Sequence, residues 1–116
     1  ADTLAIAARG DQAGLISADI IDALGPDGIL VNVSRGSVVD EDALIAALKA
    51  GRIAGAGLDV FATEPTPPAR WADVPNTTLL PHLGGGTREA LMQGSQNVLE
   101  NLRRFYAGEP LLTPVP

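Results

Sequence analysis

The chain contains no cysteine, few aromatic residues and a single histidine. Without cysteine, a disulfide framework and thiol chemistry are excluded, and a reducing cytoplasm is the expected compartment. Aromatic residues make up only 3% of the sequence, so alanine, valine, isoleucine and leucine must fill the core. That composition favours an α/β protein over an all-β sandwich. No apolar run approaches the roughly 18 residues of a membrane span, and we expect a soluble protein without membrane partners.

Basic residues are also scarce, with 8 lysines and arginines against 14 acidic residues and a net charge of −6. Nucleic acid is therefore a poor partner, because phosphate contacts need clustered lysine and arginine. One histidine and no cysteine leave too few typical ligands for a transition metal, so no metal site is predicted. Ser34 and Ser37 are weak candidates for a nucleophile, because no G-x-S-x-G elbow surrounds them.

Apolar residues make up 46% of the 116 residues, enough for the packed core of about one domain. Short apolar runs alternate with segments of helical periodicity. This alternation predicts an α/β fold, with a parallel sheet of about four strands, right-handed crossover helices and a long C-terminal helix. The predicted strands are 4–8, 29–33, 56–60 and 77–81, and the predicted helices are 17–25, 40–51 and 88–107.

The helix ends carry recognisable capping residues. Ser17, Asp40 and Thr87 are predicted N-caps, and Gly108 is predicted to end the last helix. Glu41 and Asp42 lie in the first turn of their helix, where a negative charge complements the helix dipole. The stretch "EPTPPARWADVPN" that follows the third predicted strand contains four prolines, and it is predicted to lack regular structure.

Ligands of parallel sheets bind beyond the carboxyl ends of the strands. Segments that directly follow predicted strands should therefore meet at one edge of the sheet. They contain Arg35, Asp59, Glu64 and His82, the only histidine. The four segments are 8–10, 34–36, 59–64 and 82–86.

This set of side chains suits general acid–base chemistry. A carboxylate beside a histidine favours the protonated imidazolium. An arginine can bind a carboxylate through two parallel hydrogen bonds and polarise a carbonyl. Together the groups would serve reduction of a 2-keto acid: Arg35 orients the substrate, His82 donates a proton and a cofactor donates hydride.

Each residue taken alone has a commoner explanation. A lone histidine in a loop is usually solvated, Arg35 could be a surface charge, and Glu64 before a proline could simply begin a loop. Asp59 lies in an apolar strand, where a buried carboxylate needs partners. It is therefore either hydrogen-bonded within the fold or directed at a ligand. The glycines at 84–86 are most often turn residues, although a glycine loop that opens a helix can also bind an anion.

Nucleotide-binding fingerprints are missing from the chain. The "GAG" at 55–57 precedes a strand, whereas a dinucleotide loop follows a strand and opens a helix. The "GGGTRE" segment does open a helix but lacks the third glycine of G-x-G-x-x-G. A cofactor would therefore have no usual phosphate cradle within these residues.

Taken in order, several segments resemble the D-isomer-specific 2-hydroxyacid dehydrogenases, which include phosphoglycerate, glycerate, glyoxylate and hydroxypyruvate reductases. The resemblance covers nearly the whole chain and corresponds to the second half of the family's nucleotide-binding domain plus its closing helix. It implies a partial Rossmann-like sheet over residues 1–116, closed by the helix at 88–107. The matching segments are "ILVNVSRGSVVDEDALIAAL", "GAGLDVFATEP", "LLPHLGGGT" and "NLRRFYAGEPLLTPV".

The resemblance implies a role for several residues. Arg35 matches the substrate-binding arginine, and Glu64 matches the glutamate that pairs with the catalytic histidine, His82. Asp59 matches the aspartate that binds the nicotinamide carboxamide. The cofactor that the resemblance implies is NAD or NADP. The residues implied to bind it are Ala8, Arg9, Val33, Ser34, Arg35, Asp59, His82, Gly84 and Gly85.

Two local departures affect the cofactor contacts. "AARG" replaces the family's commoner proline-containing stretch after the first strand, and Gly85 stands where serine is frequent. The implied activity is NAD(P)-dependent reduction of a 2-keto acid of the glyoxylate or hydroxypyruvate type to a D-2-hydroxy acid.

The chain also lacks the family's substrate domain and the half-domain that carries G-x-G-x-x-G. We therefore expect a fragment, a truncated gene product or one piece of a split protein. Its exposed strand edge should favour self-association, such as a homodimer. The alternative function is a catalytically incomplete fragment that acts only as an oligomerising or binding half-domain.

Overall fold

The structure is a computed structural model, which describes residues 2–8 and 12–115. The chain forms two compact units, Ala1–Leu83 and Gly84–Pro116. The first unit contains a sheet with its crossover helices, and the second contains one long helix. Among the residues that the structure describes, no helix has the length and apolarity needed to cross a membrane.

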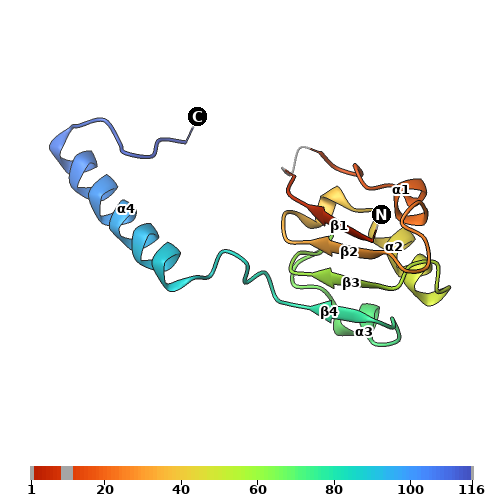
Figure 1. Cartoon of the computed structure of the whole chain (residues 1–116). Coiled ribbons are helices and arrows are strands. Elements are labelled where there is room, and N and C mark those ends of the chain that lie inside the picture. The colour runs from red at the N-terminus through yellow and green to blue at the C-terminus, as the bar shows by residue number, and fades with distance from the viewer. Residues whose placement is uncertain (1, 9–11, 116) are drawn as a thin grey trace. The chain divides into compact units, whose positions relative to one another are not determined.

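The sheet has four parallel strands, which lie side by side in sequence order (Figure 1). Leu30 in the second strand pairs with Leu4 on one side and Ala56 on the other. The predicted α/β class and four-stranded parallel sheet are confirmed, with strand boundaries shifted by at most two residues. The strands are β1 (Thr3–Ile6), β2 (Ile29–Asn32), β3 (Gly55–Leu58) and β4 (Thr77–Leu79).

Helices connect the strands of the first unit. The β1–β2 connection contains α1 (Ala18–Asp22). The β2–β3 connection contains the 3-10 turn η1 (Gly36–Val38) and α2 (Glu41–Lys49). Asp40 caps α2 as predicted, because its side chain accepts a hydrogen bond from the Ala43 N–H over 3.0 Å.

The proline-rich stretch after β3 is not entirely irregular, and this part of the prediction was wrong. It contains the short helix α3 (Pro68–Trp71). A proline at the first helical position costs nothing, since its missing N–H would have no partner there. The Trp71 ring is buried edge-to-face against Phe61, with ring centroids 5.8 Å apart, and its N–H donates to Thr66. This tertiary contact stabilises a turn whose local sequence favours a loop.

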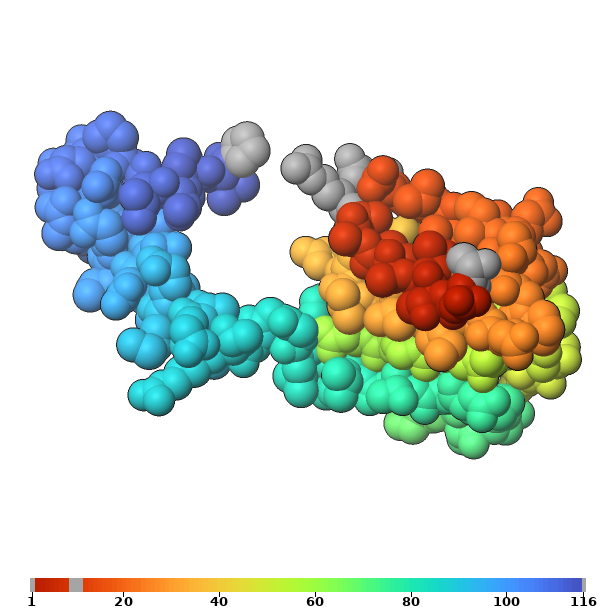
Figure 2. All heavy atoms as spheres, in the orientation of Figure 1, coloured from red at the N-terminus to blue at the C-terminus, as the bar shows by residue number. Residues whose placement is uncertain are grey.

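The core lies on one face of the sheet. Along β2, Leu30 and Asn32 are buried, whereas Ile29 is 42% exposed and the following Val33 is 60% exposed. Figure 2 shows this unit as successive bands of colour, from red near β1 to teal-green near β4, and each band reaches the surface. The fully buried apolar side chains include Ile21, Leu30, Val38, Leu44, Ala47 and Ile53.

The second unit is dominated by α4 (Arg88–Ala107). Thr87 caps the helix by accepting from the Ala90 N–H over 3.1 Å, and Gly108 ends it in the left-handed region at φ 70°, both as predicted. Hydrogen bonds from Arg103 and Arg104 lower the pKa of Glu100 to about 2. Large apolar side chains of α4 are exposed; they include Leu91, Met92, Val98, Leu99, Leu102 and Phe105.

Candidate active site

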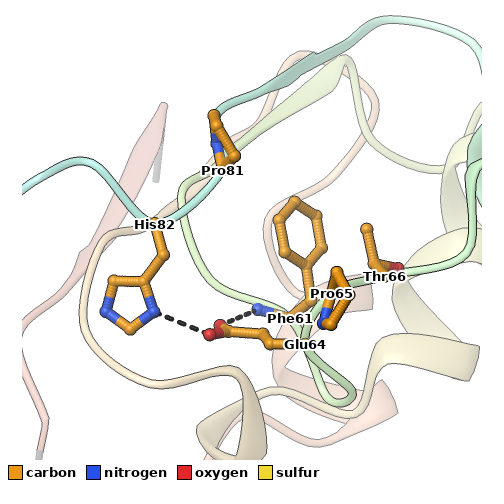
Figure 3. Close-up of a pocket in the computed structure, with 6 residues that line it drawn as sticks. All are labelled: Phe61, Glu64, Pro65, Thr66, Pro81 and His82. Carbon is orange, nitrogen blue, oxygen red and sulfur yellow. Dashed lines mark hydrogen bonds and ion pairs between the residues drawn. The ribbon is translucent and has the colours of Figure 1, made fainter.

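The only histidine and a glutamate from a different loop form a close pair. His82 follows β4, and Glu64 lies in the β3–α3 loop (residues 59–67). Their side chains point toward each other, with 2.7 Å between His82 Nδ1 and Glu64 Oε2 (Figure 3). An ionised carboxylate can only accept, so Nδ1 carries the hydrogen of this bond. Nε2 is then the ring nitrogen that can exchange a proton with a bound molecule.

Both oxygens of Glu64 are engaged, because Oε1 accepts from the Phe61 N–H over 3.0 Å (Figure 3). The pKa of Glu64 is lowered, first by the hydrogen bond from His82 and then by the bond from the Phe61 backbone. Glu64 is thus held in its ionised form, which is the form that orients and stabilises a protonated histidine.

The position of His82 depends on the neighbouring strand β3. The Leu80 N–H donates to the Leu58 carbonyl over 2.8 Å, which extends the β3–β4 ladder past the end of β4. Just beyond His82, the Leu83 N–H donates over 2.7 Å to Oδ1 of Asp59, which is only 2% exposed. His82 itself has φ 55°, an uncommon value for a residue with a side chain. Asp59 therefore has a role within the fold: it holds the segment that carries the histidine.

Arg35 is presented by a turn that a buried amide organises. Asn32 ends β2 and is 1% exposed. Its Oδ1 accepts from the Ser34 N–H over 3.0 Å, and its Nδ2 donates to the Arg35 carbonyl over 3.0 Å. Sequence reasoning missed Asn32, although an amide inside the apolar run "ILVNV" was a visible signal.

The structure brings Arg35, Glu64 and His82 together. A hollow of about 290 Å³ is lined by all three, and the charge of Arg35 contributes to the lowered pKa of Glu64. A second hollow of about 450 Å³ adjoins the His82–Glu64 pair and is mainly apolar (Figure 3). Its lining residues are Phe61, Glu64, Pro65, Thr66, Pro81 and His82.

Four further residues were predicted to bind the cofactor: Ala8, Arg9, Gly84 and Gly85. Ala8 is half-buried and packs against the core. Arg9 lies outside the described residues. Gly84 and Gly85 belong to the second unit.

The predicted nicotinamide residues Val33 and Asp59 do lie together, at the carboxyl ends of β2 and β3. They line one shallow hollow on the open face of the sheet, with apolar neighbours. Apolar walls with a carboxylate suit a flat aromatic ring that bears an amide N–H donor, so these residues fit a nicotinamide. The other residues that line the hollow are Val31, Gly57, Leu58, Thr78 and Leu80.

Comparison with known proteins shows the family of the chain. The family model described as D-isomer specific 2-hydroxyacid dehydrogenase, NAD binding domain, matches residues 2–84. Hydroxyphenylpyruvate reductase of Plectranthus scutellarioides is 48% identical over 101 residues, which cover 87% of this chain and 32% of that protein. The 2-ketogluconate reductase of Gluconobacter oxydans is 46% identical over 116 residues, covering 98% of this chain and 37% of the relative.

Solved structures show the same similarity. An NADPH-dependent glyoxylate/hydroxypyruvate reductase from Sinorhizobium meliloti, in complex with NADP and malonate, superimposes with a TM-score of 0.86 at 44% identity. The match covers 98% of this chain and 36% of that one. The chain thus spans about a third of the length of the relatives it matches. The matched motifs, the parallel sheet and the Arg35–Glu64–His82 cluster together place the chain in the D-isomer-specific 2-hydroxyacid dehydrogenase family, within its NAD-binding domain.

Proposed function

We propose that this chain supplies the proton-donating and substrate-orienting residues of an NAD(P)-dependent reductase, which converts a 2-keto acid to a D-2-hydroxy acid. The observation that carries the proposal is the 2.7 Å His82–Glu64 pair, which lines the same hollow as Arg35. These are the three groups that the reduction of a charged keto acid needs: an acid, its partner and a fixed cation.

The residues divide the chemistry between them. Arg35 binds the carboxylate of the substrate and polarises its keto oxygen. His82 donates the proton from Nε2 to the carbonyl oxygen as that oxygen gains negative charge, and Glu64 keeps the ring oriented through Nδ1. When bound, the reduced nicotinamide supplies the hydride that reaches the carbonyl carbon. Proton and hydride together convert the ketone to the alcohol.

Several residues would hold the cofactor. Asp59 would accept from the carboxamide of the nicotinamide, while Val33 and Ser34 would line its ribose side. Arg35 and His82 would also contact the cofactor on this side. Ala8, Arg9, Gly84 and Gly85 complete the predicted set, and either NAD or NADP suits the fit.

A small keto acid of the glyoxylate or hydroxypyruvate type is the proposed substrate. Relatives named as glyoxylate/hydroxypyruvate reductases, including one from Arabidopsis thaliana that is 45% identical over 101 residues, support this choice. The Plectranthus relative is named for a larger aromatic keto acid, hydroxyphenylpyruvate. The assay below therefore includes glyoxylate, hydroxypyruvate and hydroxyphenylpyruvate.

The test has two arms. In the first, NADH and NADPH fluorescence is titrated with the purified chain. In the second, the chain replaces the aligned segment of the Gluconobacter 2-ketogluconate reductase, and turnover of keto acids is measured. In this chimaera, His82→Gln should lower kcat about 10²- to 10⁴-fold, the usual contribution of a general acid, and leave the KM for NADPH nearly unchanged.

A matched pair of arginine substitutions supplies the control. Arg35→Lys should raise the KM for the keto acid, because lysine cannot form the two-pronged bond to a carboxylate. Arg88→Lys, in the first turn of α4, should leave the kinetics unchanged. An active chimaera whose rate does not change in His82→Gln would refute the proposed role. Absence of saturable cofactor binding by the chain would favour the alternative, a half-domain that only binds or oligomerises.

A further inference from the structure

Glu41 is a buried carboxylate in the first turn of α2, outside the Arg35–Glu64–His82 cluster. Its residue is only 8% exposed. One oxygen accepts from the Ala62 N–H over 2.8 Å, and the other binds the guanidinium of Arg70 in α3. Arg70 also binds the exposed carboxylate of Asp42 over 2.8 Å, and the pKa of Arg70 is raised by its bonds to Asp42 and Glu41. A carboxylate that only complemented the helix dipole would have no reason to be buried, because burial costs free energy.

The backbone group that Glu41 holds is adjacent to the one that holds Glu64. The N–H groups of Phe61 and Ala62 are consecutive in the β3–α3 loop. The first donates to Glu64 over 3.0 Å, and the second donates to Glu41 over 2.8 Å. The two N–H groups lie in successive peptide planes that meet at the Phe61 Cα. A fixed Phe61–Ala62 plane therefore leaves the preceding plane, which carries the Phe61 N–H, only the rotations about φ and ψ of Phe61.

The same peptide is confined on another side by the turn that carries Arg35. A Cβ added at Gly36 would lie 1.9 Å from the Phe61 carbonyl oxygen and 2.6 Å from the Ala62 nitrogen. Only a glycine permits this approach. The Phe61–Ala62 peptide is thus fixed by backbone contact with Gly36 and by the Glu41 hydrogen bond. Through the shared Phe61 Cα it restrains the preceding peptide, whose N–H donates to Glu64.

We propose that Glu41 is a positioning residue for the His82–Glu64 pair: it anchors the Phe61–Ala62 peptide, and this anchor fixes the Phe61 backbone, whose N–H holds the Glu64 carboxylate against His82. The functional meaning of this positioning rests on the proposed role of His82 as proton donor. The positioning itself can be measured without any activity.

The chain offers a direct probe, because His82 is its only histidine. In long-range ¹H–¹⁵N spectra of the intact 116-residue chain, the two ring nitrogens report whether Nδ1 donates to a carboxylate. Glu64→Gln provides the reference spectrum without the carboxylate. Glu41→Gln should move the His82 ring shifts at least about halfway toward that reference, because glutamine offers one acceptor oxygen where the carboxylate offers two.

Asp42→Asn is the matched control. Asp42 binds the same arginine over 2.8 Å but makes no bond to the loop among the described contacts. This substitution should leave the His82 shifts unchanged. Shifts that respond equally to both substitutions would assign the effect to Arg70 or to general loss of order, and shifts that respond to neither would overturn the proposal.

A measurement on the unaltered chain covers the case in which Glu41→Gln does not fold. Ala62 is exposed, yet its amide hydrogen should exchange at least about tenfold more slowly than an unstructured amide, because it is bonded to Glu41. Free exchange at Ala62 would overturn the proposal.

In the active chimaera, Glu41→Gln should lower kcat about 3- to 10-fold with no change in the KM for NADPH. It should cause no further loss when Glu64→Gln is already present. Additive losses would contradict action through Glu64. If the chimaera is inactive but the His82 shifts respond as expected, the proposed function fails while the positioning role stands.

Discussion

At the scale of single residues, three buried polar side chains support the segments that carry the three residues of the proposed active site. Among the described residues, the buried polar or charged side chains are Asn32, Glu41 and Asp59. Each accepts a hydrogen bond from the backbone of a different loop beyond the sheet edge. Burying a polar group without a hydrogen bond destabilises the folded state. Loss of any of these three bonds should therefore be strongly unfavourable. The acceptor and donor pairs are Asn32 with Ser34, Glu41 with Ala62, and Asp59 with Leu83.

Replacing Asn32 tests this arrangement. Asn32→Ala removes the acceptor of the Ser34 N–H and the donor to the Arg35 carbonyl in a buried place. The free energy of unfolding should fall by about 1–3 kcal/mol, the usual cost of leaving buried polar groups unpaired. Urea denaturation followed by circular dichroism measures it. Asn97→Ala on α4, where the side chain accepts only a surface hydrogen bond from Gln93, should cost less than about 0.5 kcal/mol. Equal losses would contradict the special role of Asn32.

The ionised state of Glu64 predicts a dependence of stability on pH. Its pKa in the folded chain is lowered, first by the His82 bond. The stabilisation is therefore complete above the pKa of an unfolded glutamate, about 4.3, and is lost as the pH falls through the lower folded value. Solvent screening keeps the effect small, since the side chain is 35% exposed.

Denaturation of the wild type and of Glu64→Gln between pH 7 and pH 3 provides the measurement. The stability advantage of the wild type should shrink below about pH 4.3. A difference in stability that stays constant down to pH 3 would show that the partners of Glu64 do not lower its pKa in the folded chain.

At the scale of elements, the site depends on how closely the β2–η1 turn approaches the β3–α3 loop. Gly36 is the point of contact, with space for a hydrogen but not for a methyl group. Both loops leave the same edge of the sheet, because parallel strands share their direction. The crossover helix α2 returns the chain to β3 and, through Glu41, bonds the loop that follows.

Gly36→Ala should therefore be destabilising. The added Cβ would lie 1.9 Å from the Phe61 carbonyl oxygen, so one of the two backbones must move. We expect a loss of about 1–3 kcal/mol in the free energy of unfolding, typical of overpacking. In Gly57→Ala the new Cβ would meet its nearest neighbour, a Val31 methyl, at an ordinary 3.9 Å, and this control should be neutral within about 0.5 kcal/mol. A neutral Gly36→Ala would mean that the two loops are not tightly packed.

At the scale of the whole molecule, the sheet has a free edge at β1, which pairs only with β2 among the described strands. The Ile29 N–H donates to the Asp2 carbonyl over 3.0 Å. Because bonding alternates along a parallel strand, the N–H and carbonyl of Ala5 point away from β2. An exposed ladder edge of this kind favours pairing with another chain.

We therefore predict that the chain self-associates through β1. Light scattering over a range of concentrations should give an average mass that rises with concentration. Ala5→Pro removes an outward N–H without removing a bond to β2, and it should shift the mass toward that of a monomer. Ala5→Thr keeps the N–H and should associate as the wild type does. A monomeric wild type at every concentration would rule the prediction out.

Local sequence was sufficient for the order of the four strands and of the helices α1, α2 and α4, and for most of their boundaries. Strand runs of β-branched and aliphatic residues and the caps Asp40, Thr87 and Gly108 act over a few residues, and all appear in the structure as predicted. Ser17 is the exception: it lies at the N-cap of α1, but its side chain makes no capping bond. The α3 turn was missed because its stability comes from the burial of Trp71, which no local pattern encodes.

The residues Arg35, Glu64 and His82 could be chosen from the sequence, since each follows a strand and each matches a family motif. The hydrogen bonds of the buried residues that support them depend on the tertiary structure. The sequence pattern placed Glu41 at a helix dipole and left two possibilities for Asp59, whereas folding joins Glu41 to Ala62 and Asp59 to Leu83, across 21 and 24 residues. The periodicity of apolar residues predicts structure only over a few neighbouring residues of one helix or strand. Hydrogen bonds over such separations exist only once the parallel crossovers have brought the strand ends to one edge.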